Sequence, residues 1–140
     1  HEEREIGFRS YFREHAPQFE VLETLVNAET RQVTEEATLS LLRRHADLAG
    51  LYVAGGGMEG AFTALREADP RPAPRLVVSE LTADSRAALA DGTLTMAMST
   101  PLRRLGDTLV QHMIEAVRGG GDRPAGQVFL PFSIHLPESV

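Results

Sequence analysis

The stretch from Leu48 to Ala68, which reads LAGLYVAGGGMEGAFTALREA, decides the fold class. It begins with a short apolar run over 48–54, breaks at the glycines Gly55 to Gly57, and continues with apolar residues at helical spacing. A buried apolar run followed by a glycine turn and an amphipathic helix is typical of a strand–turn–helix unit. Because such units build parallel sheets, the stretch predicts an α/β fold.

The alternation of helix and strand patterns continues on both sides of this unit. Before it, we expect a helix over 8–15 that ends at Pro17, a strand over 19–26, and a helix from about Thr30 to His45 with Val33, Ala37, Leu41 and Leu42 on one face. After it, we expect strands over 76–78 and 93–98, a helix over 82–89 capped by Thr82, a long amphipathic helix opened by Thr100 as N-cap and Pro101, and an extended edge segment over 127–136. The first helix lacks the strand that should precede it, so we interpret the chain as part of a larger protein.

The composition excludes several classes of function. The chain has 140 residues and a formal net charge of −6, which argues against a nucleic-acid-binding surface, because phosphate neutralisation requires clustered cations. It contains no cysteine, which excludes disulfides, thiolate nucleophiles and Cys-ligated zinc. All 14 basic residues are arginine, which excludes a Schiff-base lysine and a phosphate-loop lysine. No apolar run approaches the roughly 18 residues of a membrane span, so we expect no membrane partner.

Ligands of open parallel sheets bind at the carboxyl ends of the strands, so the residues that follow each expected strand are site candidates. These candidates are Asn27, Gly55 to Gly57, Ser79 to Thr82, and Ser99 to Thr100, with Arg4 on the helix that opens the chain. The set is polar and weakly charged, which suits an uncharged polyhydroxyl ligand better than a phosphate. The histidines show no metal-ligand spacing, and no serine is placed as in a catalytic triad. We therefore expect no metal, no cofactor and no catalytic residue.

One motif favours a different function. Gly55, Gly57 and Gly60 satisfy the pattern G-x-G-x-x-G after an expected strand and before an expected helix, and Glu80 ends the next strand. This pattern is the dinucleotide-binding fingerprint, in which glycines let a pyrophosphate approach a helix N-terminus and the acid binds a ribose hydroxyl. Three consecutive glycines satisfy it easily, so a structural or ligand-facing turn is the alternative.

The order of several short motifs resembles the ligand-sensing domain of the LacI/GalR family of bacterial transcription regulators. The motifs that carry the resemblance are Arg4–Phe8, Leu51–Ala54 followed by Gly60–Phe62, Val77–Thr82, Pro101–Gly106 and Leu130–Ile134. At three positions the chain departs from the family pattern. Gly55 and Gly56 replace an Asn-Asp pair, Glu80 stands near the usual aspartate, and Ser99 replaces a glutamine.

The resemblance implies a Rossmann-like three-layer α/β sandwich with a mainly parallel sheet, which is most of the C-terminal subdomain of a periplasmic-binding-protein type I fold. Residues 1–100 would form the effector-binding subdomain without its first strand. Residues 101–140 would form a crossover helix and a terminal strand that pack toward the N-terminal subdomain or back on the sheet. The implied ligand-binding residues are Arg4, which would bind ligand hydroxyls, and Gly55, Gly56, Glu80 and Ser99.

The resemblance also implies a function, namely a non-enzymatic sensor of a sugar, a polyol or a related metabolite in a cytoplasmic homodimer. Closure of the ligand cleft would change DNA binding through a helix-turn-helix that lies upstream, outside this chain. Two alternatives stay open. The first is a periplasmic sugar-binding receptor of an ABC transporter. The second is a fragment of a dinucleotide-binding enzyme that uses Gly55, Gly57, Gly60 and Glu80.

Overall fold

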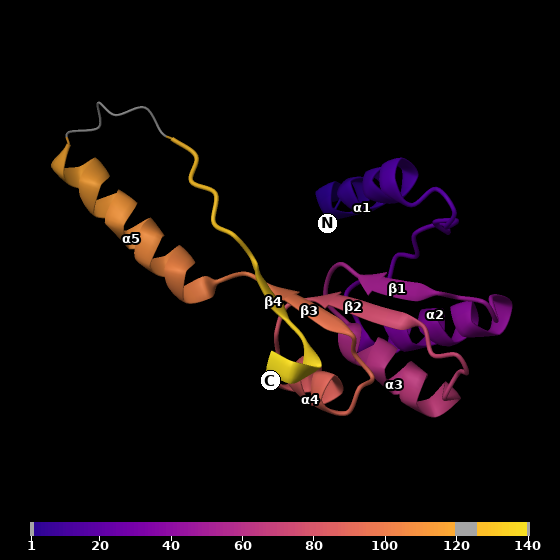
Figure 1. Cartoon of the computed structure of the whole chain (residues 1–140). Helices are drawn as coiled ribbons and strands as arrows, with labels where there is room; N and C mark the ends of the chain where they lie inside the picture. The colour runs from indigo at the N-terminus through magenta and orange to yellow at the C-terminus, as the bar shows by residue number, and fades with distance from the viewer. Residues whose placement is uncertain (1, 120–125, 140) are drawn as a thin grey trace.

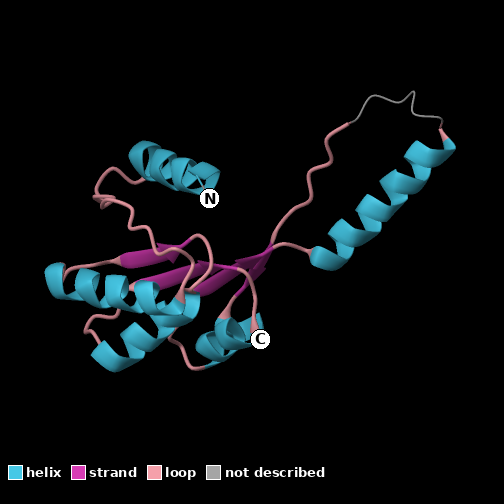
Figure 2. Ribbon diagram, turned by 180° about the vertical axis from the view of Figure 1, so that it is seen from behind, coloured by secondary structure: helices cyan, strands magenta, loops and turns pink. Residues whose placement is uncertain are grey.

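The chain forms one four-stranded sheet with helices on both faces (Figures 1 and 2). The computed structural model describes residues 2–119 and 126–139. Its helices are α1 (Glu2–His15), α2 (Arg31–Arg44), α3 (Met58–Ala68), α4 (Ala83–Ala90) and α5 (Leu102–Arg118), and a short 3-10 helix spans Pro137–Ser139. Its strands are β1 (Gly50–Val53), β2 (Arg75–Ser79), β3 (Met96–Ser99) and β4 (Ser133–His135).

The sheet is mainly parallel, as the alternation of strand and helix patterns predicted. Its strand order is β1-β2-β3-β4. The first three strands are parallel, with Leu51 beside Leu76 and Val78 beside Ala97. β4 runs antiparallel to β3 at the edge of the sheet, and His135 lies beside Ala97. The expected α/β class and the expected edge position of the last extended segment are therefore confirmed.

The apolar core lies between the sheet and the three helices α2, α3 and α4, which cover the same face (Figure 2). Phe62 of α3 and Leu89 of α4 are almost fully buried against Leu76 of β2. The opposite face carries α1 (Figure 1). There, Phe8 stacks on Tyr52 of β1 with the ring centroids 5.5 Å apart. The expected three-layer arrangement is confirmed.

The predicted buried face of α2 is wrong at its N-terminal end. Val33 is 38% exposed, whereas Thr34 and Thr38 are buried. The reason is the close approach of α3, because a Cβ atom on Gly57 would lie only 2.5 Å from the Thr34 hydroxyl. Only small side chains fit between the helices, and the Thr38 hydroxyl is satisfied by donating to the Thr34 carbonyl oxygen at 2.7 Å.

Of the two N-caps predicted from the sequence, Thr82 is confirmed and Thr100 is wrong. Thr30 caps α2, and Thr82 caps α4 in a capping box with Ser85. At α5 the N-cap is Pro101, with no side-chain cap, and not Thr100 as predicted. The Thr100 hydroxyl instead donates to Glu80 Oε1 at 3.2 Å.

The predicted strand over 19–26 is absent from the described structure. Its sequence alternates apolar and polar residues, but no ladder joins it to β1. The carbonyl oxygen of Leu22 accepts a hydrogen bond from the Arg9 guanidinium of α1 at 3.0 Å. This segment is therefore held by side chains from a helix, and its backbone does not extend the sheet.

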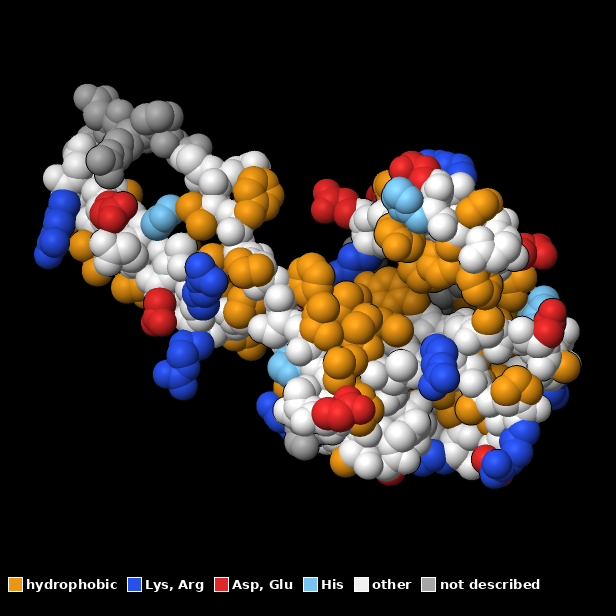
Figure 3. Space-filling model, in the orientation of Figure 1, with side chains coloured by type: hydrophobic (Ala, Val, Ile, Leu, Met, Phe, Trp, Pro, Cys, Tyr) orange, Lys and Arg blue, Asp and Glu red, His pale blue; other side chains and the backbone are white. Residues whose placement is uncertain are grey.

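We call α5 together with residues 126–132 the arm. The arm projects away from the sheet (Figures 1 and 3), and α5 contains no buried residue. The exposed large apolar residues of the arm are Leu102, Leu105, Leu109, Val110, Met113, Ile114, Val117, Val128, Phe129 and Phe132. Within residues 2–119 and 126–139, no helix is long and apolar enough to cross a membrane.

Candidate functional site

The loop that follows β1 is fixed by an asparagine from an earlier part of the chain. Asn27 Nδ2 donates to the carbonyl oxygen of Gly56 and to the Thr34 hydroxyl, each at 2.8 Å. Asn27 Oδ1 accepts from the backbone N–H of Glu29 at 3.0 Å. Asn27 thus ties the start of α2 to the glycine loop, where Gly55 and Gly56 are half-buried.

Arg4 reaches the same loop from α1. Its guanidinium donates to the carbonyl oxygen of Ala54, the residue directly after β1, at 2.5 Å. Arg4 lies one helical turn before Phe8, which stacks on the sheet, and the two residues therefore share the inner face of α1. The structure brings Arg4 beside the Gly55–Gly56 loop, and their role in ligand binding stays a prediction.

Glu80, at the end of β2, has an unusual backbone conformation. Its φ is +87°, in the left-handed region that side chains other than glycine rarely adopt. Its backbone N–H donates to the Met98 carbonyl oxygen at 2.5 Å, and its carbonyl oxygen accepts from the Ser85 hydroxyl at 3.3 Å. The Thr100 hydroxyl donates to Glu80 Oε1 at 3.2 Å. Strained backbone held from several sides is concentrated at functional sites, so the conformation supports Glu80 as a site residue.

Ser99, at the end of β3, pairs with a histidine. Its hydroxyl lies 2.8 Å from His135 Nε2, and both side chains are half-buried. The register of β3 and β4 places Ser133 directly beside Ser99 and sets His135 two residues further along β4. The Ser99 hydroxyl is therefore hydrogen-bonded within the chain. His135 Nε2 either donates or accepts in this bond, according to the tautomer of the ring.

The predicted site residues form two groups along one edge of the sheet. We call this edge the carboxyl edge and define it by Arg4, residues 54–57, residues 79–80 and residues 99–100. Arg4, Gly55 and Gly56 lie at the end of β1, whereas Glu80 and Ser99 lie at the ends of β2 and β3. The groups share this edge because parallel strands end on the same side of a sheet.

Three contacts of the carboxyl edge were not predicted. The sequence predicts Asn27 and Thr100 as site candidates because each follows an expected strand, but their partners Gly56 and Glu80 are distant in sequence. His135 had no recognisable signal, because only the pairing of β4 with β3 brings it to Ser99.

The glycines of the dinucleotide fingerprint serve helix packing. Gly57 has a φ of +81°, and a Cβ atom there would lie 2.6 Å from the Thr30 carbonyl oxygen. A Cβ atom on Gly60 would overlap the Arg31 carbonyl oxygen. The start of α3 is thus packed closely against the start of α2, and this close approach accounts for Gly57 and Gly60 without a pyrophosphate.

Two open cavities lie away from the carboxyl edge. One, of about 410 Å³, lies between α1 and the segment after it and is lined by Arg9, Phe12, Arg13, Pro17, Phe19 and Val21. The other, of about 370 Å³, lies near the amino ends of β2 and β3 and includes Arg66, Arg75 and Asp91. In the part of the chain that the structure describes, no group of three or more acidic or histidine side chains is arranged to hold a metal ion.

Known structures are similar to the chain over nearly its whole length. A sugar-binding protein of a sugar ABC transporter from Bacillus halodurans has a TM-score of 0.84 and 17% identity, over 99% of this chain and 51% of that protein. Two ABC transporter solute-binding proteins from Agrobacterium vitis each have a TM-score of 0.83. One, with bound D-fucose, is 15% identical over 96% of this chain and 46% of its own. The other, bound with α-D-tagatopyranose, is 21% identical over 98% and 45%.

The chain therefore spans about half the length of the solved structures that it matches. At these identities the likeness establishes the fold, and it agrees with the expected periplasmic-binding-protein type I arrangement. The comparison with curated proteins gave no match. A family model described as a periplasmic binding protein domain matches residues 1–121, and the chain belongs to that family.

Proposed function

We propose that this chain is one lobe of a sugar-binding receptor of the kind that serves ABC transporters. The observation that carries the proposal is the carboxyl edge, where a guanidinium, a carboxylate and hydroxyl groups lie at the ends of three parallel strands. Family membership supports it, as do the ligands named for two structural neighbours, which are monosaccharides.

The chemistry of the edge suits a neutral polyhydroxyl ligand. Arg4 supplies several N–H donors in a fixed plane, which match adjacent sugar hydroxyls. Glu80 accepts hydrogen bonds, and Ser99 and Thr100 can donate or accept. The glycines after β1 offer backbone groups in place of side chains, so the ligand can approach the chain closely there. We propose that the protein is not an enzyme and that Arg4, Gly55, Gly56, Glu80 and Ser99 contact the sugar.

We also propose that the arm belongs to the second lobe. Residues 1–100 would form the lobe described above, and residues 101–140 would cross into the other lobe and return at β4. The arm carries side chains such as Val117 and Phe129, which are 83% and 86% exposed. A soluble protein rarely leaves so continuous an apolar surface uncovered. The missing half of the length of the matched structures supplies the chain that would cover it.

The proposal is tested by calorimetric titration of the full-length protein with D-fucose and D-tagatose. We expect saturable binding, and a loss of affinity of at least about ten-fold for Arg4→Ala and for Glu80→Ala, because each removes a charged hydrogen-bonding partner. Arg13→Ala is the matched control, since Arg13 is exposed and its polar contacts within the described residues are with Ser10 and Glu14 of its own helix. Absence of saturable binding of a broad panel of sugars by the folded wild-type protein would contradict the proposal.

The LacI-type regulator is the second candidate, and the motif order from Arg4 to Ile134 favours it. It requires a cytoplasmic homodimer and an upstream DNA-binding domain, and these stay predictions. A transport receptor acts outside the cytoplasm. Cell fractionation together with a mobility-shift assay on DNA adjoining the gene separates the two. Extracytoplasmic protein that does not bind DNA supports the receptor, and cytoplasmic protein that binds it supports the regulator.

A further inference from the structure

We propose that Arg9 and Thr24 are positioning residues that hold Arg4 at the loop after β1. This inference rests on the proposed function at one point, namely that Arg4 binds the sugar. It concerns a closed ring of contacts that joins α1, the connector over residues 17–29 and the glycine loop. The ring has three links.

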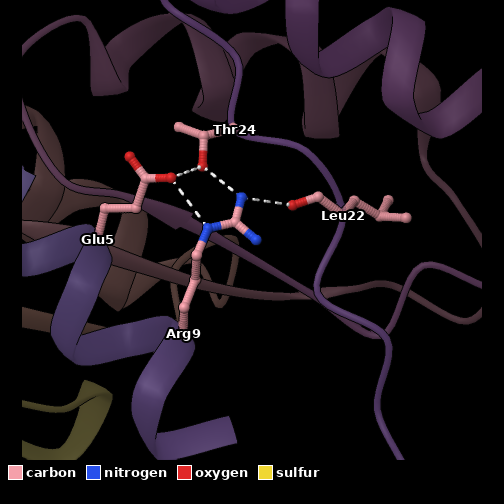
Figure 4. Close-up of polar contacts among 4 residues, drawn as sticks. All are labelled: Glu5, Arg9, Leu22 and Thr24. Carbon is pink, nitrogen blue, oxygen red and sulfur yellow. Dashed lines mark hydrogen bonds and ion pairs between the residues drawn. The ribbon is translucent and has the colours of Figure 1, made fainter. Parts of the chain in front are cut away.

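The first link joins α1 to the connector (Figure 4). Arg9 Nε donates to Glu5 Oε1 at 2.9 Å, and an Arg9 NH₂ group donates to the Thr24 hydroxyl at 2.9 Å. The Thr24 hydroxyl donates to the same oxygen of Glu5 at 2.6 Å, which closes a triangle of hydrogen bonds. Arg9 also donates to the Leu22 carbonyl oxygen at 3.0 Å. Charge-assisted bonds of this kind have defined directions, so they fix how α1 lies on the connector.

The second link joins the connector to the glycine loop. Asn27, three residues after Thr24, donates to the Gly56 carbonyl oxygen at 2.8 Å. The third link closes the ring, because the Arg4 guanidinium donates to the Ala54 carbonyl oxygen two residues before Gly56. Arg4 is therefore connected to the glycine loop both directly and through Glu5, Arg9, Thr24 and Asn27.

Besides the ring, two aromatic contacts hold α1, one between Phe8 and Tyr52 of β1 and one between Phe12 and Phe19 of the connector. The helix contains no buried residue, and its ring stack on the sheet is the contact between Phe8 and Tyr52. Apolar contact is non-directional, so it holds a helix against a sheet without fixing its slide or rotation. The hydrogen bonds of Arg9 supply that restraint one turn away from Arg4. Without them α1 remains attached, and the Arg4 guanidinium loses its place over the carboxyl edge.

The test measures the affinity of the full-length protein for D-fucose and D-tagatose in Thr24→Val and Arg9→Met. Thr24→Val keeps the shape of the side chain and removes its hydroxyl. We expect each substitution to weaken binding roughly ten-fold, because a binding group displaced by about an ångström loses much of its effect. In an Arg4→Ala background, the same substitutions should change affinity by less than about two-fold, since the residue that they position is gone. Arg13→Met, one turn further along α1, is the control and should leave affinity unchanged.

Three outcomes decide the matter. Losses that depend on the presence of Arg4 support the inference. Full affinity in both variants overturns the inference. Losses of the same size with and without Arg4 also overturn it, because they would indicate general destabilisation. Either result leaves the proposed function intact. If the folded wild-type protein binds no sugar of a broad panel, the proposed function fails and the inference falls with it. Should Arg9→Met not fold, Thr24→Val alone carries the test.

Discussion

The two faces of the sheet are covered by different kinds of contact. On one face, α2, α3 and α4 bury an apolar core that includes Phe62, Leu76 and Leu89. On the other face, α1 contributes one aromatic stack and the hydrogen bonds of Arg4 and Arg9. Apolar burial supplies most of the free energy of folding, whereas exposed hydrogen bonds add little to it and fix geometry. The first face therefore stabilises the chain, and the second places a predicted ligand-binding residue.

The largest effect is expected from the core face. Phe62 is 1% exposed, so Phe62→Ala should lower the free energy of unfolding by about 3–5 kcal/mol through lost burial and a cavity. Phe8→Ala on the other face should cost clearly less, because Phe8 is only half-buried. Urea unfolding followed by circular dichroism measures both values. Equal losses of unfolding free energy in Phe62→Ala and Phe8→Ala would mean that both faces stabilise the chain to the same extent.

A smaller effect is expected from the contact between α2 and α3. Gly60→Ala forces a methyl group against the Arg31 carbonyl oxygen, and should lower the free energy of unfolding by about 1–3 kcal/mol. Gly7→Ala in α1 is the matched control, since nothing lies within 4 Å of its added Cβ. Alanine is the better helix former, so the control should stabilise the chain by about 0.5–1 kcal/mol. Thermal unfolding of both variants measures the two changes in stability, one from the packed helix α3 and one from the exposed side of α1.

Substitutions of Glu80 test whether its strained backbone is kept because the side chain binds the sugar. Glu80→Gly removes the penalty of a φ of +87° and should raise the free energy of unfolding by up to about 1 kcal/mol, while sugar affinity falls. Glu80→Gln keeps the strained backbone and should leave stability close to that of the wild type. Paired denaturation and calorimetry give both quantities. A loss of stability in Glu80→Gly would mean that the lost contact with Thr100 and the greater freedom of glycine in the unfolded chain together outweigh the strain.

The smallest effect expected is a pH dependence of the contact between Glu5 of α1 and the connector. Hydrogen bonds from Thr24 and then from Arg9 hold the pKa of Glu5 below its ordinary value of 4.5. A carboxyl group whose pKa is lowered in the folded state stabilises that state above the ordinary value, and the contribution is lost as the pH falls through the lowered value. We expect the NMR signals of residues 22–24 to shift in that acidic range. Glu5→Gln should abolish the shift, and a shift that persists in this variant would assign it to another group.

The periodicity of local sequence predicted the helices and most strands, since burial of one face depends on nearby spacing. The prediction of a strand over 19–26 was wrong although the outer side of β1 has no neighbouring strand. Alternation of apolar and polar residues does not fix what a backbone oxygen pairs with, and the Leu22 carbonyl oxygen accepts from Arg9 of α1. The inner face of α2 failed for a similar reason. Thr34 is buried because Gly57 and Gly60 let a second helix come close, and no local pattern in α2 records that approach.

The carboxyl edge was predictable as a set of positions and not as a set of contacts. The rule that parallel strands end together places Gly56, Glu80 and Ser99 on one edge. Their partners depend on strand register and loop conformation, which bring Ser99 to His135 over 36 positions and Thr100 to Glu80 over 20. The left-handed backbone of Glu80 had no signal either, because a glycine or asparagine would be the expected residue there.

The base of the arm has a mechanical consequence. The chain leaves the sheet after Ser99 and returns at Ser133, and these two residues lie side by side in the register of β3 and β4. Two adjacent antiparallel segments form a narrow pivot, about which a rigid body turns with small changes in a few backbone angles. The first residue beyond the pivot, Thr100, is hydrogen-bonded to the carboxylate of Glu80. The Thr100 hydroxyl thus joins the base of the arm to Glu80, one of the predicted ligand-binding residues of the carboxyl edge.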